Sequence, residues 1–198
     1  VMVASGADNV YDTDVLTTLR EAIDRYAVAT HHAIFTETDP DSAGRASRII
    51  ADHIRTITFM AADGVVPSNI ERGYVMRRLA RRAIREALVL GINNELLEHI
   101  APFVIELYEP EYPELKHKAQ EILKVLNAEE ANFRQTLGRG LREFTKEAGQ
   151  ELSGEVLFKL FDTYGFPKEL SVEEAKRNDI PVAQNAAVVF NDLMDVQR

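Results

Sequence analysis

Six arginines between Arg72 and Arg85 form the most concentrated group of charged side chains in this sequence. They belong to the stretch PSNIERGYVMRRLARRAIRE, residues 67–86, and no acidic residue lies among them. At about 100° per residue, the five arginines from Arg77 onward fall within an arc of roughly 140° on a helix. Like charges on one helix face repel each other. The pattern therefore predicts an anionic partner, either phosphate groups or the carboxylates of a neighbouring helix or domain.

The basic run stands out because the chain as a whole is acidic, with a formal net charge of −9 over 198 residues. Salt screens charges beyond roughly 8–10 Å, so a local basic surface binds an anion despite the overall charge. The chain has no cysteine, which excludes disulfides and thiolate metal sites and fits the cytoplasmic location that we expect. Apolar runs are far shorter than the ~20 residues of a membrane span, so we expect no membrane partner.

Sequence patterns of catalytic and cofactor sites are missing from this chain. It has no Gly-x-x-x-x-Gly-Lys loop, no Gly-x-Gly-x-x-Gly motif and no His-Glu-x-x-His motif. We interpret the histidines as surface or core residues, because no two are spaced as His-x-x-x-His. They are His31, His32, His53, His99 and His117. The chain on its own is therefore predicted to be catalytically inactive and to hold no cofactor or metal.

Apolar residues spaced at about 3.6 positions run along almost the whole chain and predict an all-α fold. A polar break is expected after His31. Helices are predicted over about 13–30, 41–62, 69–90, within 92–114, and over 114–147, 154–164 and 171–177, with a weakly specified tail after Asp179. We divide the chain into a first helical subdomain, 1–113, and a second part, 114–198, in which a long helix leads to a second helical subdomain.

Local signals indicate where several of these helices begin and end. Two Ser-x-x-Glu capping boxes, Ser68–Glu71 and Ser171–Glu174, predict two helix starts. Gly64 is typical of a helix end, because glycine adopts the left-handed conformation without a steric penalty. Gly138 and Gly140 are each expected to weaken the long helix by roughly 1 kcal/mol relative to alanine.

Three segments of the chain resemble the alanyl-tRNA synthetase family. The longest is IIADHIRTITFMAADGVVPSNIERGYVMRRLARRAIR; the others are DNVYDTDVL and LFKLFDTYGFPKELSVEEAKRNDI, and all follow the family's order. The chain departs from the pattern of many relatives at Ile70 and Glu71. The resemblance implies the middle, tRNA-recognition domain of a longer enzyme, and a start at Val1 rather than Met agrees with this. A class II catalytic domain using ATP and Mg would precede it, and an editing domain holding Zn would follow.

The same resemblance implies a target, which is the acceptor stem of alanine tRNA with its G·U wobble pair read from the minor groove. The residues that read this pair in the family correspond to Asn69 and Asp162. Contacts to the RNA backbone would come from Arg72, Arg77, Arg78, Arg81 and Arg82. The parent would be an ATP-dependent alanine–tRNA ligase, and its catalytic and editing domains would be the other partners.

Each of these assignments has a structural alternative. Asn69 also fits the first turn of a helix. Asp162 lies near a predicted helix C-terminus, where the helix dipole disfavours negative charge by ~0.3–1 kcal/mol unless a cation such as Lys159 neutralises it. Tyr164 suits core packing as well as stacking on RNA. For the whole chain, the alternatives are a structural connector between catalytic and editing domains, and a free-standing helical RNA-binding protein.

Overall fold

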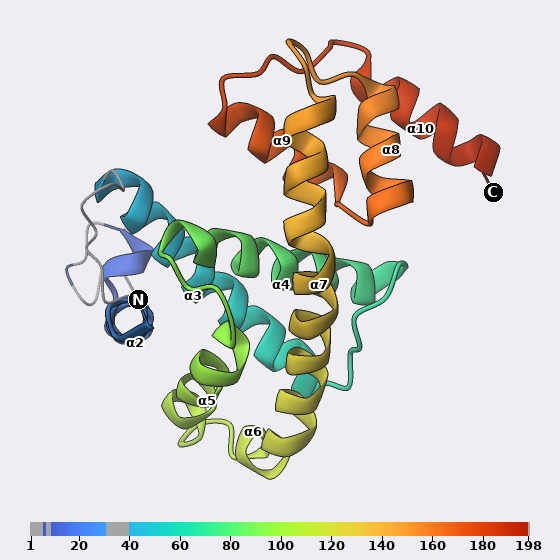
Figure 1. Cartoon of the computed structure of the whole chain (residues 1–198). Helices are drawn as coiled ribbons and strands as arrows, with labels where there is room; N and C mark the ends of the chain where they lie inside the picture. Colours follow the sequence, from blue (N-terminus) through green and yellow to red (C-terminus); the bar gives the residue numbers. More distant parts are fainter. Residues whose placement is uncertain (1–5, 7–8, 31–39, 198) are drawn as a thin grey trace. The chain divides into compact units, whose positions relative to one another are not determined.

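The computed structural model describes residue 6 and residues 9–30 and 40–197, and it confirms the all-α fold. Within these residues every named element is a helix, and an isolated bridge joins Leu152 to Val182. The polar break expected after His31 lies outside the described residues as far as position 39, as do His31 and His32. The chain divides into two compact units, Val1–Ala131 and Asn132–Arg198. Residues of α7 (Ala119–Glu147) belong to both units (Figure 1).

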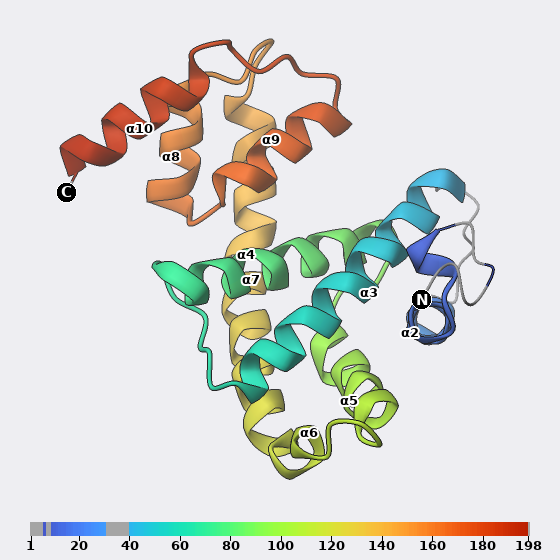
Figure 2. The same cartoon turned by 180° about the vertical axis from the view of Figure 1, so that it is seen from behind.

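The first unit is built around two long helices, α3 (Pro40–Ala62) and α4 (Glu71–Val89), which pack against each other and lie side by side from both directions of view (Figure 2). The other elements of this unit are η1 (Val10–Asp12), α2 (Asp14–Thr30), α5 (Leu96–Tyr108), α6 (Glu114–His117) and the first part of α7. Helices α2 and α5 both contact α3. The core contains Ile50, Ile54, Ile57, Met76 and Ile84, all fully buried.

The long helix predicted from 114 to 147 is interrupted at Lys118, which separates α6 from α7. Lys118 has φ −99° and ψ 7°, and its Nζ donates a hydrogen bond of 2.6 Å to the carbonyl oxygen of Ala62. Ala62 is the last residue of α3, where an ammonium group complements the negative end of the helix dipole. Along the predicted 114–147 stretch, a set of large apolar side chains at three- to seven-residue steps is buried except at Leu141, which is half-buried. The buried members of this set are Leu115, Ile122, Leu126, Phe133, Leu137 and Phe144.

The second unit combines the rest of α7 with α8 (Gly154–Tyr164), α9 (Lys168–Arg177) and α10 (Ala186–Gln197). Helix α8 packs against both α9 and α10. The tail that the sequence specified weakly forms α10, because Phe190 is buried and anchors it. The capping box predicted at Ser171 is wrong. Helix α9 begins three residues earlier, and Ser171 is buried inside it with its Oγ donating to the carbonyl of Pro167 at 3.3 Å.

Gly140 has a packing role that its helix propensity alone does not indicate. It is buried in α7 against Phe166, and a Cβ at this position would lie 2.6 Å from the ring carbon Cδ2. Gly138 is exposed on the same helix, and a Cβ there would meet only Arg142 Nη1, at 3.8 Å. Close packing of the backbone against the Phe166 ring therefore explains why position 140 is glycine, but it does not explain the glycine at position 138.

Replacing these two glycines by alanine should change stability in opposite directions. Gly140→Ala should lower the free energy of unfolding by up to about 2 kcal/mol, because overpacking costs ~1–3 kcal/mol and alanine recovers only ~1 kcal/mol of helix propensity. Gly138→Ala should raise it by up to about 1 kcal/mol. Urea denaturation of the two variants measures both effects, and a stabilised Gly140→Ala protein would contradict the packing role.

Candidate nucleic-acid interface

The loop that precedes α4 folds back onto the first turn of that helix and thereby positions Asn69. The backbone N–H of Ser68 donates to the carbonyl of Gly73 at 3.1 Å, and the N–H of Ile70 donates to Ser68 Oγ at 3.3 Å. A Cβ at position 73 would lie 2.2 Å from Ser68 Oγ and 2.5 Å from the carbonyl oxygen of Val66. Only glycine leaves room for this approach, so Gly73 is what allows the loop to close on the helix.

The capping box predicted at Ser68–Glu71 is not formed. Helix α4 begins at Glu71 instead of near Asn69, and its N-cap Ile70 makes no side-chain cap hydrogen bond. Glu71 has φ 48°, a left-handed conformation, and therefore does not take the ordinary place of a capping-box glutamate. The Ser68 hydroxyl is used locally instead, because serine side chains readily bond to backbone groups two residues away. Asn69 consequently lies in the loop and is exposed, so the alternative that placed it in the first helical turn is wrong.

The two faces of α4 separate much as the periodicity predicts. Its buried residues include Met76, Ala80, Ala83, Ile84 and Ala87, while the arginines lie on the opposite side, with Arg72 and Arg78 exposed and the others half-buried. Val75 is apolar but 40% exposed. Together with Val66, Ile70 and Tyr74, it makes the surface beside Asn69 partly apolar.

Two of the arginines are held by one carboxylate of the long helix. Arg81 Nε donates to Glu129 Oε1 at 2.7 Å, and Arg77 Nε lies 3.5 Å from Glu129 Oε2. The Glu129 side chain is only 5% exposed. Carboxylates of another helix were one of the two partners expected for the arginine run, and this expectation is confirmed for Arg77 and Arg81. The sequence did not single out Glu129, because its distance of 48 positions from Arg81 leaves no local signal.

Arg77 also connects this ion pair to the loop. Its Nη1 donates a hydrogen bond to Asn69 Oδ1, and its Nη2 donates to the carbonyl of Pro67 at 3.1 Å. The structure therefore brings one predicted base-reading residue and one predicted backbone-contacting residue into direct contact. Arg72 and Arg78 are exposed, and Arg82 is half-buried.

Asp162 belongs to the second unit, where it is exposed in the last turn of α8. Ser153 Oγ caps the start of this helix by accepting from the N–H of Val156, and Gly165 ends it with φ 64°. Lys159 was the alternative explanation for Asp162. Its Nζ donates to Glu147 at 2.8 Å, and this bond raises the pKa of Lys159 above its ordinary value. The hydrogen-bond partner of Lys159 is therefore Glu147 on α7.

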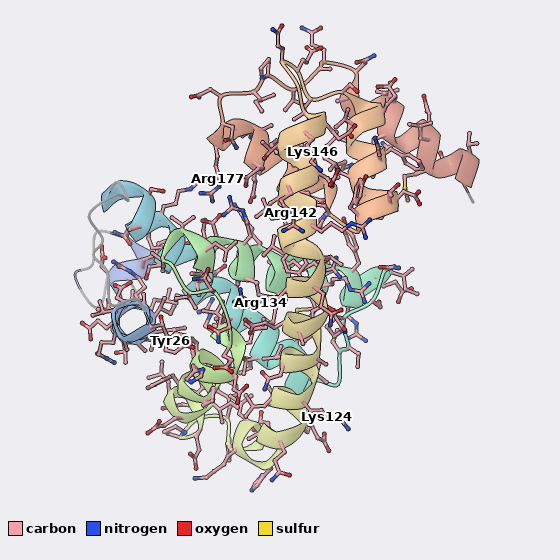
Figure 3. The ribbon with its side chains drawn as sticks, in the orientation of Figure 1. Tyr26, Lys124, Arg134, Arg142, Lys146 and Arg177 are labelled. Atoms are coloured by element: carbon pink, nitrogen blue, oxygen red, sulfur yellow. The ribbon has the colours of Figure 1, made fainter. Side chains whose placement is uncertain are left out.

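The second unit also carries basic side chains that the sequence analysis did not select. Arg142 and Lys146 project from α7 (Figure 3). The guanidinium carbon of Arg139 lies 5.1 Å from the centroid of the Tyr164 ring, which is half-buried. This cation–π contact occupies a tyrosine for which the sequence left core packing and RNA stacking open. The sequence did contain a pattern that pointed to these residues, because the second half of the predicted long helix is rich in arginine.

His53 on α3 is a buried titratable side chain next to the basic helix. Burial lowers the pKa of His53 below its ordinary value, and the charge of Arg82 adds to this, while a hydrogen bond with Asp52 and the charge of Glu86 act in the opposite direction. Among the described residues its Nε2 has no hydrogen-bond partner, so protonation would bury an unpaired N–H. The structure thus favours the neutral imidazole.

This lowered pKa predicts a loss of stability on the acidic side of neutrality. The unfolded chain takes up the His53 proton near pH 6.5, and the folded chain does so only at lower pH. The contribution of neutral His53 to the free energy of unfolding is therefore fully present above about pH 6.5 and decreases as the pH falls below it. Urea midpoints measured from pH 7.5 to 5 should show this slope. It should be smaller in His53→Gln and retained in His117→Gln, whose side chain is exposed; equal slopes in both variants would contradict the assignment.

The part of the chain that the structure describes shows neither a metal site nor a membrane-spanning helix. No group of three or more His, Asp and Glu side chains there is arranged to hold a metal ion. None of the helices in that part is both long enough and apolar enough to cross a membrane. The candidate sites are the loop and helix surface around Asn69 and the α4 arginines in the first unit, and the C-terminal end of α8 around Asp162 in the second unit.

Comparison with known proteins gives consistent matches over most of the chain. The family model described as tRNA synthetases class II (A) matches residues 1–195. The alanine–tRNA ligase of Cereibacter sphaeroides (strain ATCC 17025 / ATH 2.4.3) is 44% identical over 172 residues, which is 84% of this chain and 18% of that protein. The alanine–tRNA ligase of Rickettsia akari (strain Hartford) is 47% identical over 140 residues, covering 68% of this chain and 16% of that protein. The chain thus spans less than a fifth of the length of these relatives.

Proposed function

The chain belongs to the class II tRNA synthetase (A) family, and from that premise we propose that it recognises the acceptor stem of alanine tRNA within an alanine–tRNA ligase. In that parent enzyme, a catalytic domain using ATP and Mg would form alanyl-adenylate and transfer alanine to the tRNA end. An editing domain with Zn would lie on its other side. This chain would contribute specificity by positioning the correct tRNA, without taking part in bond chemistry.

The proposed target is the G·U pair of the acceptor stem, read from the minor groove. A-form RNA has a shallow minor groove that side chains reach, whereas its major groove is too deep and narrow. In a G·U pair the guanine 2-amino group lacks the base partner that it has in G·C. A carboxylate is an acceptor-only group and suits this donor, which is the role proposed for Asp162. An amide offers both donors and an acceptor and suits a contact to both bases, which is the role proposed for Asn69.

The observation that carries the proposal is the exposed and oriented amide of Asn69 beside the arginine face of α4. Because Arg77 holds one lone pair of Asn69 Oδ1, the amide presents its two N–H donors and its second lone pair in a defined orientation. Arg72 and Arg78 are exposed on the same helix. We assign direct phosphate contact to these two arginines first, since Arg77 and Arg81 are engaged by Glu129.

A binding titration of the 198-residue chain against acceptor-stem hairpins tests this function. The hairpins carry either G·U or G·C at the third pair and are compared at two salt concentrations. The G·U hairpin should bind more tightly, and two phosphate contacts should give a slope of about −1.4 to −1.8 in a plot of log affinity against log salt. Equal affinity for the two hairpins would reject base reading by this chain.

A second candidate function is that of a structural connector between other domains of the parent. The observation that favours it is that one continuous helix, α7, contributes to both units. On this alternative the arginines would contact protein, and the chain would show little salt-dependent affinity for either hairpin. The same titration therefore separates the two functions.

A further inference from the structure

Three residues of the first unit form a connected chain of polar contacts that ends at the candidate base-reading amide. Glu129 contacts Arg77, and Arg77 contacts Asn69. We propose that Glu129 is a positioning residue for RNA recognition, whose buried carboxylate sets the orientation of the Asn69 amide through Arg77. This inference rests on the function proposed above and adds to it a residue that never touches RNA.

The carboxylate of Glu129 is itself firmly placed. One oxygen accepts from Arg81 at 2.7 Å, the other faces Arg77 at 3.5 Å, and the side chain is almost completely buried. The next residue, Glu130, accepts hydrogen bonds from the N–H groups of Leu96 and Leu97 at 3.0 and 2.7 Å. The two neighbouring glutamates therefore tie α7 to different helices, Glu129 to α4 and Glu130 to the start of α5.

Arg77 is suited to transmit this placement because its guanidinium group is planar and forked. Its three nitrogens face Glu129, Asn69 and the carbonyl of Pro67, so the ion pair, the amide and the loop backbone share one rigid group. An exposed asparagine in a loop would otherwise be ordered only when RNA binds, and that ordering opposes binding. Pre-orientation by Arg77 removes this cost for a base pair that matches the amide.

The contacts also divide the arginines of α4 into two groups with different effects on binding. Arg72 and Arg78 are exposed and are proposed to contact phosphates directly. Arg77 and Arg81 share the single negative charge of the buried Glu129 carboxylate, and they act on orientation. If Glu129 is neutralised, its negative charge no longer offsets these two arginines, and their attraction for phosphates increases. Neutralising Glu129 should therefore weaken base selectivity while keeping or increasing affinity for the backbone, which loss of structure alone would not do.

The test compares Glu129→Gln with its matched control Glu130→Gln in the 198-residue chain, at a temperature where both proteins are folded. Glu129→Gln should reduce the ratio of G·U to G·C hairpin affinity by about 3- to 10-fold, leave affinity for the G·C hairpin unchanged or higher, and steepen the salt slope. Glu130→Gln should lower stability and leave the ratio unchanged. In an Asn69→Ala background, Glu129→Gln should have no further effect on the ratio, because both changes act on one contact.

A second measurement tests the positioning without RNA. Nuclear magnetic relaxation of the Asn69 side-chain amide should show an ordered group in the unchanged protein and in Glu130→Gln, and a mobile group in Glu129→Gln. If the amide is equally mobile in all three proteins, the inference is overturned whatever the hairpins show. If the amide responds as expected and the unchanged protein does not distinguish G·U from G·C, the proposed function fails and the positioning by Glu129 stands. A third outcome is that the Asn69 amide becomes mobile in Glu129→Gln while the ratio of G·U to G·C hairpin affinity stays that of the unchanged protein. In that case the role of Glu129 in RNA recognition is overturned.

Discussion

Replacement of Asp162 by alanine should reduce the preference of the chain for a G·U over a G·C acceptor stem by about 5- to 150-fold, the range of one good polar contact to a base edge. The reason is chemical complementarity. An ionised carboxylate is an acceptor with no donor, and the unpaired guanine 2-amino group of G·U is a donor. Asp162→Asn should have a smaller effect, because the amide keeps a neutral acceptor but loses the charge that strengthens the bond.

The matched control for Asp162 lies on the same helix. Glu155 is exposed in the first turn of α8, so Glu155→Gln removes one negative charge from the same element far from the candidate reading position. Affinities for the two hairpins should change together in this control. Because Asp162 is exposed, its replacement should alter the free energy of unfolding by less than about 1 kcal/mol. A connector role predicts the reverse, with reduced stability and an unchanged affinity ratio.

The helices themselves were predictable from the sequence because their apolar residues repeat with the helical period and face a core. The predicted 41–62 helix corresponds to α3, and the predicted 13–30 helix corresponds to α2. The interruption at Lys118 was not predictable in the same way. At this position Lys118 Nζ contacts the carbonyl of Ala62, 56 positions away, and a contact over that distance leaves the local apolar pattern unchanged.

The capping boxes were wrong for a different physical reason. A Ser-x-x-Glu spacing describes what the two side chains are able to do, and serine competes for nearby backbone groups in other ways. At Ser68 the loop folds back onto Gly73, and Ser171 lies inside a helix that begins at Lys168 with Pro167 as its N-cap. Gly73 was the available signal, because a glycine inside a predicted helix often marks a close approach of another backbone.

Some residues of the candidate site were identified by resemblance to a family, and others are recognised only from contacts in the three-dimensional structure. Asn69 and Asp162 were selected from motifs, and nothing in composition or periodicity points to them. Glu129 and Glu130 carry the contacts that place the loop and the start of α5, yet in the sequence they are two of 32 acidic residues with no distinguishing pattern. Pairings between distant helices depend on the packing of those helices, which a local pattern does not encode.

Removal of the Glu130 side chain should be the most destabilising single change considered for the first unit. Helix α5 begins at Leu96 after Glu95, which is in the left-handed conformation and provides no side-chain cap. Glu130 caps it from another helix, and Glu130→Ala would leave two buried N–H groups without their acceptor. Each unsatisfied buried group costs about 1–3 kcal/mol, so the free energy of unfolding should fall by about 3 kcal/mol.

The control for this effect is Glu121→Ala, an exposed acid on the same helix, which should change stability by less than about 1 kcal/mol. Hydrogen exchange adds a local measurement, because the amides of Leu96 and Leu97 should exchange faster in Glu130→Ala and at an unchanged rate in Glu121→Ala. A loss of stability without faster exchange at these two amides would mean that Glu130 acts through other contacts. Faster exchange confined to the start of α5 would instead show that the Glu130 carboxylate on α7 holds the start of this helix.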